Sequence, residues 1–417
     1  MTRLRVSSMT TWWMLLGIVV MVTGCSRTPS SPLFHDAIDP PTLAEWGVFA
    51  IDDGRLIPQR GVVDYELNTP LFSDYAHKLR TVWMPEGTQG RYTSDGELEF
   101  PVGTIITKTF YYPLVDTRDA SRVLRTAAPR GLEAGGRLIL DEVRLIETRI
   151  LVHRSSGWAA STYVWDASQR EARLERTGAI RPLTLVDVSA RTERSASVDF
   201  DYVVPDVNQC AGCHATDVKR AVMSPIGLKV RHLNRDHLYG GEIGRRNQLE
   251  YWAESGRLSV SAANAFGATA LPRAAAWDDV TAPLEARARA YLDINCSHCH
   301  NPRGPADTSG LSLEASETSA VALGVCKSPI AAGRGTGNRK FGLVPGLPEE
   351  SITVYRMAST DPGAMMPELG RTLAHDEGVA LISRWIAEWP GSRGCDQETS
   401  NSARHSASAS RLSRSQG

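Results

Sequence analysis

The sequence has no excess of charge of either sign and no long hydrophobic run. Its 46 basic and 47 acidic residues give a net charge of −1, so the composition does not point to a nucleic-acid partner. The apolar stretch 12–22 is too short to span a bilayer. Residues 396–417 contain almost no apolar side chains, and we expect a disordered tail because this segment cannot bury enough surface to order itself.

The N-terminal segment has the layout of an export signal. Two arginines precede the apolar stretch 12–22, which has the length of a signal-peptide core, and 22–25 (VTGC) follows it. This tetrad resembles a bacterial lipobox. We therefore expect a lipoprotein signal peptide over 1–24, a lipid on Cys25 as membrane anchor, and an exported protein that faces the periplasm. Ser26 slightly favours the outer membrane, and an ordinary signal peptide with an incidental cysteine is the alternative.

Two copies of one five-residue motif carry the strongest chemical signal. Segments 210–214 (CAGCH) and 296–300 (CSHCH) both read Cys-x-x-Cys-His, the attachment signature of c-type haem. Four thiols can form thioethers with haem vinyl groups, and two histidines are placed to bind the irons. These residues are Cys210, Cys213, His214, Cys296, Cys299 and His300. The sequence therefore predicts two covalently attached haem c groups.

Other uses of a Cys-x-x-Cys pair remain open at this point. Two such pairs can close a structural zinc site, and one pair can act as a thioredoxin-like dithiol. Neither chemistry requires a histidine directly after the second cysteine in both copies. We therefore favour haem.

The cysteine count predicts one further pairing. Of the seven cysteines, four belong to the two motifs and Cys25 is the expected lipid site. Cys326 and Cys395 remain, and two leftover thiols in an oxidising periplasm usually pair. We expect a Cys326–Cys395 disulfide, with two free buried thiols as the alternative.

The pattern along the chain indicates a multidomain protein. Residues 25–45 contain Ser-Pro and Pro-Pro steps and are expected to form a linker. Between 46 and 200 there are no long amphipathic helical stretches, whereas β-branched and aromatic runs such as 104–112 and 159–165 alternate with turn signals. We predict a mainly β sandwich or barrel over 46–200.

From about residue 205 the pattern becomes helical and rich in loops. Apolar residues over 284–292 recur on one helix face that runs into the second motif, and 379–389 is a second amphipathic segment before Pro390. A helix leading into Cys-x-x-Cys-His and a closing aromatic helix resemble the packing of class I c-type cytochromes. We predict mainly α cytochrome c-like haem modules, the first over 201–280 and the second, class I-like, over 281–395.

The sixth ligand of the second iron is predicted from a methionine pair. Met365 and Met366 precede Pro367 and follow His300 at a distance that resembles the distal Met-Pro loop of class I cytochromes. Methionine or histidine in this position tunes the haem potential. We choose Met366, because the residue directly before the proline is the usual ligand, and Met365 is the alternative.

Several residues compete as the sixth ligand of the first iron. Pro225 follows His214 where a class I-like proline carbonyl accepts from the histidine ring, which would place Met223 on the wrong face. His232 and His237 are the nearest other candidates. A ligand from the β domain and an iron with no sixth protein ligand also remain open.

Several short strings resemble an uncharacterised family of bacterial di-haem c-type cytochrome lipoproteins. They are 71–76 (LFSDYA), 100–104 (FPVGT), 147–149 (ETR), 163–165 (YVW), and both haem motifs with Met366-Pro367. The resemblance covers roughly 45–395. It implies an exported electron carrier whose partners are periplasmic or outer-membrane redox proteins, including a parallel β-helix protein.

Three functions follow as hypotheses. The first is a lipid-anchored, periplasm-facing di-haem cytochrome that transfers electrons between redox partners, since the β domain has no convincing catalytic set. The second is a di-haem peroxidase or oxidase in which the first iron is open. The third is a β module that binds a partner and carries the haems for it. We favour the electron carrier over the enzyme.

Overall fold

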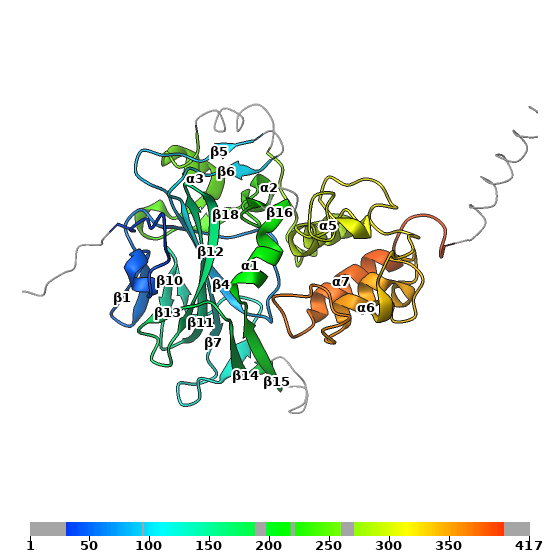
Figure 1. Ribbon diagram of the computed structural model, residues 1–417, viewed down its shortest axis with the longest axis horizontal. Coiled ribbons are helices and arrows are strands. Elements are labelled where there is room, and N and C mark those ends of the chain that lie inside the picture. The colour runs from blue at the N-terminus through cyan, green and yellow to red at the C-terminus, as the bar shows by residue number, and fades with distance from the viewer. Residues whose placement is uncertain (1–30, 94–95, 188–196, 218–221, 260–270, 396–417) are drawn as a thin grey trace, which may run out of the picture.

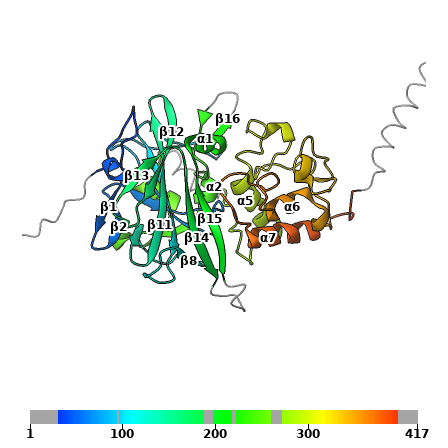
Figure 2. The ribbon, with the colours of Figure 1, turned by 60° about the horizontal axis from the view of Figure 1, so that its bottom comes forward.

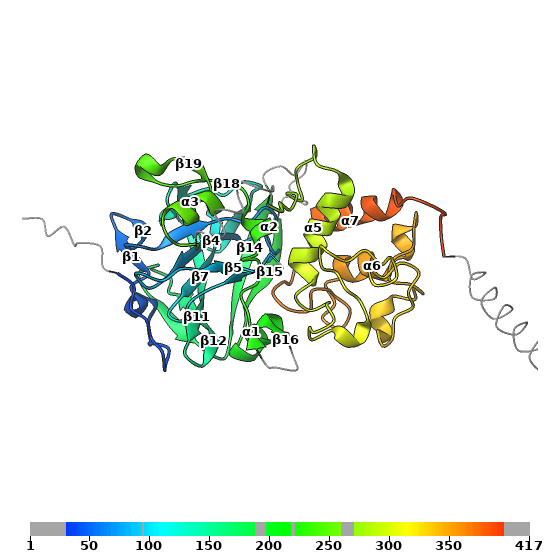
Figure 3. The same ribbon diagram turned by 90° about the horizontal axis from the view of Figure 1, so that it is seen from above.

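The computed structural model describes residues 31–93, 96–187, 197–217, 222–259 and 271–395 (Figure 1). A β-rich part and a C-terminal part of helices and loops lie side by side (Figures 1 and 3). The helix α1 (Val207–His214) lies on the side of the β-rich part that faces the C-terminal part (Figure 2). No helix within the described ranges is long and apolar enough to cross a membrane.

A six-stranded antiparallel sheet forms the centre of the β-rich part. Its order is β13 (Ala172–Glu175), β12 (Gly157–Trp165), β11 (Val143–Arg154), β7 (Ile105–Pro113), β4 (His77–Trp83) and β3 (Val63–Tyr65). Strands β7 and β11 pair from Val143 opposite Pro113 to Val152 opposite Ile105, with one irregularity between Leu145 and Glu147. Their many Thr, Ile, Val and aromatic residues suit a pleated, largely buried surface.

The two faces of this sheet bury different clusters. Ile105 and Tyr111 of β7 belong to a core that includes Trp46, whereas Ile106 and Phe110 point to the opposite face. Side chains alternate between the faces of a strand with a period of two. Lys108 therefore shares the face of Ile106 and Phe110, and a charged residue lies between two apolar clusters.

Smaller sheets border the central one. A four-stranded sheet contains β1 (Phe49–Asp52), β2 (Arg55–Pro58), β10 (Arg137–Ile139) and β9 (Leu132–Glu133). A three-stranded sheet contains β15 (Ser197–Val204), β14 (Ala179–Asp187) and β8 (Arg122–Arg125), in which β8 runs parallel to β14. The short strands β5 (Arg91–Tyr92) and β6 (Leu98–Glu99) pair with each other.

The described part of the expected linker, 31–45, packs against the β-rich part. The 3-10 helix η1 (Leu43–Trp46) buries its two apolar ends in the core. Asp39 accepts a hydrogen bond from Arg154 Nη2 at 2.6 Å, and both side chains are largely buried. Burial and this ion pair hold the segment in place, so it differs from the free linker that its proline steps suggest.

The segment that carries the first motif also packs on the central sheet. It contains α1, β16 (Ala215–Asp217), β17 (Val222–Met223), α2 (Val230–Leu233), β18 (Asp236–Leu238), η3 (Gly241–Ile243), β19 (Arg245–Asn247) and α3 (Gln248–Glu254). Leu233 and Trp252 from this segment share one buried cluster with Val82, Ile106 and Leu151 of the sheet. The described residues of this segment therefore cover a sheet face and share the core of that sheet.

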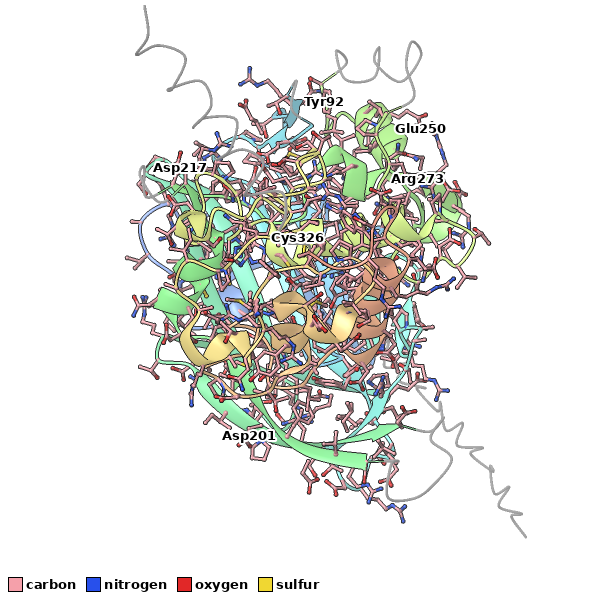
Figure 4. The ribbon with its side chains drawn as sticks, turned by 90° about the vertical axis from the view of Figure 1, so that its right-hand side faces the viewer. Tyr92, Asp201, Asp217, Glu250, Arg273 and Cys326 are labelled. Atoms are coloured by element: carbon pink, nitrogen blue, oxygen red, sulfur yellow. A yellow bond between two sulfur atoms is a disulfide. The ribbon has the colours of Figure 1, made fainter. Side chains whose placement is uncertain are left out.

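The C-terminal part has its own apolar cluster. It contains α5 (Leu284–Cys296), η4 (Asp307–Ser309), η5 (Gly333–Thr336), η6 (Pro348–Glu350), α6 (Ile352–Ala358) and α7 (Asp376–Ala387). Tyr291 and Leu292 of α5 pack with Ile382 and Trp385 of α7. Cys326 and Cys395 form a disulfide with their Cα atoms 5.4 Å apart. Figure 4 looks onto this part, with Cys326 near the centre of the view.

The predicted fold class of a β domain followed by mainly α cytochrome c-like modules is wrong. Strands hold 30% of the residues and helices only 20%, and no helical cytochrome c-like module is evident in the described ranges. Around the first motif, short helices and hairpins pack their apolar side chains against the central sheet, and not against one another as in a helical module. In the second part, loops and 3-10 turns fill most of 297–351 between α5 and α6.

Candidate functional site

The first motif lies on a short helix with a well-formed N-terminus. Asp206 caps α1 by accepting hydrogen bonds from two backbone N–H groups of the first turn, and Gln209 returns its side-chain oxygen to the Asp206 N–H at 3.1 Å. This reciprocal arrangement is a capping box. Cys210 and Cys213 are three residues apart on this helix and therefore lie on the same side of it, with His214 as its last residue.

His214 is held in one tautomer. Its Nδ1 lies 2.8 Å from the carbonyl oxygen of Ser224. Since a carbonyl can only accept, Nδ1 carries the proton and Nε2 keeps a free lone pair. The acceptor is the residue directly before Pro225, not the proline itself as we expected. Burial and the charge of Lys108 lower the pKa of His214 to about 3, so the ring is neutral.

The second motif repeats this arrangement by different means. Cys296 ends α5, and the chain turns so that the His300 N–H bonds to the Cys296 carbonyl at 2.9 Å. His300 Nδ1 lies 3.1 Å from Ser309 Oγ, whose own proton goes to the Ala306 carbonyl at 2.6 Å. Ser309 therefore accepts from His300 Nδ1–H, and Nε2 again keeps a free lone pair. Burial and the charge of Arg356 lower the pKa of His300 to about 4.

All four thiols of the two motifs are free. Burial raises the pKa of Cys210 and Cys213, and it raises the pKa of Cys296 and Cys299 to about 12. Buried thiols of this kind stay protonated and are poor nucleophiles. Cys326 and Cys395, by contrast, are joined in a disulfide.

A cavity of about 1000 Å³, counting space open to solvent, borders the first motif. Its wall comes mainly from three parts of the chain: the segment that carries α1 and residues 225–228, the central sheet, and the C-terminal part. These contribute Cys210, Cys213 and His214; Ile106, Lys108, Phe110 and Arg149; and His298, Pro367, Leu369 and Gly370.

Two basic residues of this wall, Lys108 and Arg149, and the neighbouring Lys78 converge on one aromatic ring. Lys78 Nζ, Lys108 Nζ and Arg149 Cζ lie 5.5, 5.8 and 4.3 Å from the centre of the Phe110 ring. Arg149 is paired with Glu147, whose side chain is fully buried. Burial and neighbouring positive charges lower the pKa of Lys108 to about 7.

Glu147 is the one anion paired within this cluster of three basic side chains, so the cluster has fewer anions than basic groups. Lys78 donates to the Ala76 carbonyl, but for Lys108 no hydrogen bond or salt bridge occurs among the residues that the structure describes. Buried cations are costly unless they are paired with negative charge. The cavity wall beside the first motif is therefore suited to a ligand that carries carboxylates.

The two motifs meet at the boundary between the β-rich and C-terminal parts. His298, inside the second motif, borders the cavity of the first. The charge of His298 contributes to the lowered pKa of His214, and Cys213 contributes to the raised pKa of Cys299. Segments far apart in the sequence thus place two Cys-x-x-Cys-His motifs side by side.

The two histidines predicted as distal ligands of the first iron are occupied elsewhere. His232 Nε2 donates to Asp293 at 2.7 Å, and the ring is 1% exposed. His237 Nε2 donates to Asp64, also at 2.7 Å. Neither ring borders the cavity of the first motif. Sequence reasoning overlooked His298, although its position inside the second motif was visible.

The methionine pair lies in a loop that the rest of the molecule holds firmly. Met365 is buried, at 8% exposure, and Met366 is half-buried. The Met366 N–H donates to the Arg356 carbonyl at 2.9 Å, and Arg371 Nη2 donates to the Met366 carbonyl at 2.8 Å. Arg356 is also the residue whose charge acts on His300, so loop and second motif share this neighbour.

The string 71–76 ties this loop to the β-rich part. The Asp74 carboxylate accepts from the backbone N–H groups of Thr372 and Leu373 at 2.8 and 2.7 Å. Phe72 stacks on His375, with ring centres 4.4 Å apart. The string that carries the family resemblance therefore positions the segment after Met366.

Two of the sequence predictions concern residues that the structure does not describe. Cys25 and the tail 396–417 lie outside the described residues. Within the described ranges, no three His, Cys, Asp or Glu side chains gather as a metal-binding group. A haem site does not need such a group, since the porphyrin itself supplies four of the iron ligands.

Comparisons with protein-family models, curated proteins and solved structures find no match for this chain.

Proposed function

We propose that this chain carries two covalently attached haem c groups and transfers electrons through them between redox partners. The observation that carries the proposal is the repeated geometry of the two motifs. Each presents two free thiols and a neutral histidine whose Nδ1–H is bound, which leaves Nε2 available. This is the arrangement that orients an imidazole as a metal ligand.

The donor set at each motif, two free thiols and one oriented histidine, has the chemistry that a haem c requires. Cys210 and Cys213 would form thioethers at the first motif, and Cys296 and Cys299 at the second. A bound haem c supplies one-electron exchange at its iron. Lys108, beside the first motif and without an anionic partner, would pair with haem carboxylates.

The axial ligands follow from the same residues. His214 and His300 are the proposed fifth ligands, each fixed in its tautomer by a hydrogen bond to Nδ1. Met366 remains the proposed sixth ligand at the second iron, with Met365 as its alternative. The position of His298 beside His214 supports electron exchange between the two haems within one chain.

A dithiol function is disfavoured by the thiols themselves. Thioredoxin-like pairs work because the pKa of one thiol is lowered, which produces a reactive thiolate. Burial here raises the pKa of all four motif thiols.

Export and lipid anchoring complete the proposal. The Cys326–Cys395 disulfide suits an oxidising compartment, in which haem c is also attached. With a lipid on Cys25, the protein would be tethered at a membrane and face the periplasm, with the outer membrane favoured. Its partners would be periplasmic or outer-membrane redox proteins, including, by resemblance, a parallel β-helix protein.

The test is haem stoichiometry after export together with the haem-attachment machinery. The pyridine haemochrome spectrum and the intact mass should give two c-type haems per chain. Replacing Cys210 and Cys213 by Ala, or Cys296 and Cys299 by Ala, should remove one haem each. The matched control replaces Cys326 and Cys395 by Ser and should retain both haems. A full chain that matures without any covalent haem would overturn the proposal.

A further inference from the structure

On the proposed function of electron transfer, the first iron has one ligand in His214, and a low-spin carrier would take a second one from a side chain that borders the same cavity. Histidine nitrogen and methionine sulfur are the usual protein ligands in this position. The described histidines and methionines therefore form the set of candidates.

No methionine of the described ranges borders this cavity. The methionines concerned are Met84, Met223, Met357, Met365 and Met366. Met223, the nearest in sequence, pairs with Ala215 in the β16–β17 hairpin and packs beside the cluster under α2 and α3.

Most described histidines are held by hydrogen bonds elsewhere. His232 and His237 donate to buried carboxylates. Four more have partners away from the cavity: His35, His77, His153 and His375. His300 belongs to the second motif. Within the described part of the chain, only His298 borders the first cavity together with His214.

His298 has an unused ring nitrogen. Its Nδ1 is buried and makes no hydrogen bond of ordinary geometry among the described residues, and the Ile294 backbone is the one hydrogen-bonding group that acts on this ring. Buried polar atoms without a partner are uncommon, and one at a functional site calls for an explanation. A ligand that arrives in the cavity would supply the partner that this imidazole lacks.

Lys108 is the competing nitrogen in the cavity wall, but its surroundings suit a different role. Its ammonium shares the Phe110 ring with Lys78 and Arg149. Three cations at one ring favour the anionic edge of a ligand over a further cation such as iron. Lys108 therefore fits haem carboxylates better than the metal.

We infer that His298 is the sixth ligand of the first haem iron. The inference rests on the proposed function. Since His298 and Cys299 are consecutive, these two residues would also link the first iron to the thioether of the second haem through one short stretch of backbone. The two haems would then be joined within one chain, and the first iron would be closed to exogenous ligands.

The experiment uses the full matured chain and records the spin state of the ferric haems by absorption and electron paramagnetic resonance. Haem content and mass are measured first, so that loss of haem is separated from loss of a ligand. In the unaltered protein both irons should be low-spin. In His298→Ala one of the two haems should become high-spin, and added imidazole should restore the low-spin signal.

Two further variants and one measurement fix the interpretation. His298→Met should keep both irons low-spin and raise one midpoint potential. His35→Ala, whose ring contacts Trp46 on the opposite face of the sheet, should change nothing. Near-infrared magnetic circular dichroism of the unaltered protein should show imidazole–imidazole ligation at one iron, a readout that needs no variant to fold.

Three results would overturn the inference. A high-spin iron in the unaltered protein would show an open site and favour the peroxidase or oxidase alternative. A high-spin iron in Lys108→Met, with His298→Ala unchanged, would assign the ligand to Lys108. A near-infrared spectrum without imidazole–imidazole ligation would exclude His298. If both haems are present in these cases, the proposed haem attachment still stands.

Discussion

Asp293 joins the two motif-bearing segments, and its removal should destabilise the protein strongly. It lies on α5 shortly before Cys296 and is 3% exposed. Its carboxylate accepts from Arg231 Nε and Nη2 at 2.8 and 2.9 Å, from His232 Nε2 at 2.7 Å, and from the Ala315 N–H at 3.0 Å. Arg231 and His232 belong to α2, which lies in the segment that carries the first motif.

The change Asp293→Asn keeps the side-chain volume but removes the negative charge. Breaking a buried ion pair by removing one partner costs about 3–5 kcal/mol, because the other charge stays buried without compensation. Asn can still accept one or two of these hydrogen bonds, so we expect a loss near 3 kcal/mol at pH 7. Denaturant unfolding followed by circular dichroism measures this loss.

The effect should depend on pH with a defined sign. Burial alone raises the pKa of Asp293, but the hydrogen bonds from His232 and Arg231 outweigh it and hold the pKa below its usual range. A lowered carboxyl pKa stabilises the fold above the unfolded value of about 3.9. This contribution is lost as the pH falls below that value, so the difference between wild type and Asp293→Asn should shrink from pH 7 to pH 3.

The matched control is an exposed ion pair on α7. Arg384 and Glu388 are paired at 2.8 Å with side chains 65% and 55% exposed. Glu388→Gln should cost less than about 1 kcal/mol, because solvent screens such pairs. If Asp293→Asn unfolds at the same denaturant concentration as Glu388→Gln, the structural role assigned to Asp293 is refuted.

Three further predictions concern the haems and the disulfide. Met366→Ala should abolish the weak charge-transfer band of a methionine-ligated ferric haem, whereas Met365→Ala should leave it. Lys108→Met should lower one midpoint potential at pH 6, below its pKa of about 7. A unit charge that acts across about 10 Å is worth roughly 1–2 kcal/mol at an effective dielectric constant of about 20, or some tens of millivolts. Replacing Cys326 and Cys395 by Ser should cost about 4 kcal/mol, because their bond closes a loop of 69 residues.

Each of these predictions has a result that would contradict it. If the band is lost in Met365→Ala and kept in Met366→Ala, the ligand is Met365. The exposed control is Lys340→Met. If the midpoint potential in Lys108→Met is equal to or higher than in this control, the charge of Lys108 does not act on the haem. A cysteine variant that unfolds within about 1 kcal/mol of the wild type would show that loop closure stabilises little here.

The local pattern of the sequence determined several elements correctly. The run 104–112 corresponds to β7, the apolar face over 284–292 to α5, and the segment before Pro390 to α7. These elements follow from periodicity and from turn or stop signals, which act over a few residues. The motif chemistry likewise lies within five consecutive residues, which is why it is readable without a structure.

The partners of these elements were decided only by tertiary structure. The short helices that contain Leu233 and Trp252 bury apolar side chains, which could pack in a helical module or against a sheet. In the structure they pack against Ile106 and Leu151 of the central sheet. An amphipathic pattern states that one face is buried but not what covers it. The mainly α modules were predicted wrongly for that reason.

The candidate site shows the same division. The thiols and the two motif histidines could be named from the sequence alone, since their spacing is local. The sequence alone could not place His298, Lys108 and Arg149 beside His214. Lys108 and Arg149 lie on strands far from α1 in the sequence, and His298 lies in the second motif. Nearness in sequence favours His232 and His237, but both rings donate hydrogen bonds to buried carboxylates on other elements. Spacing along the chain specifies which residues can bind a cofactor, whereas long-range packing decides which of them face it.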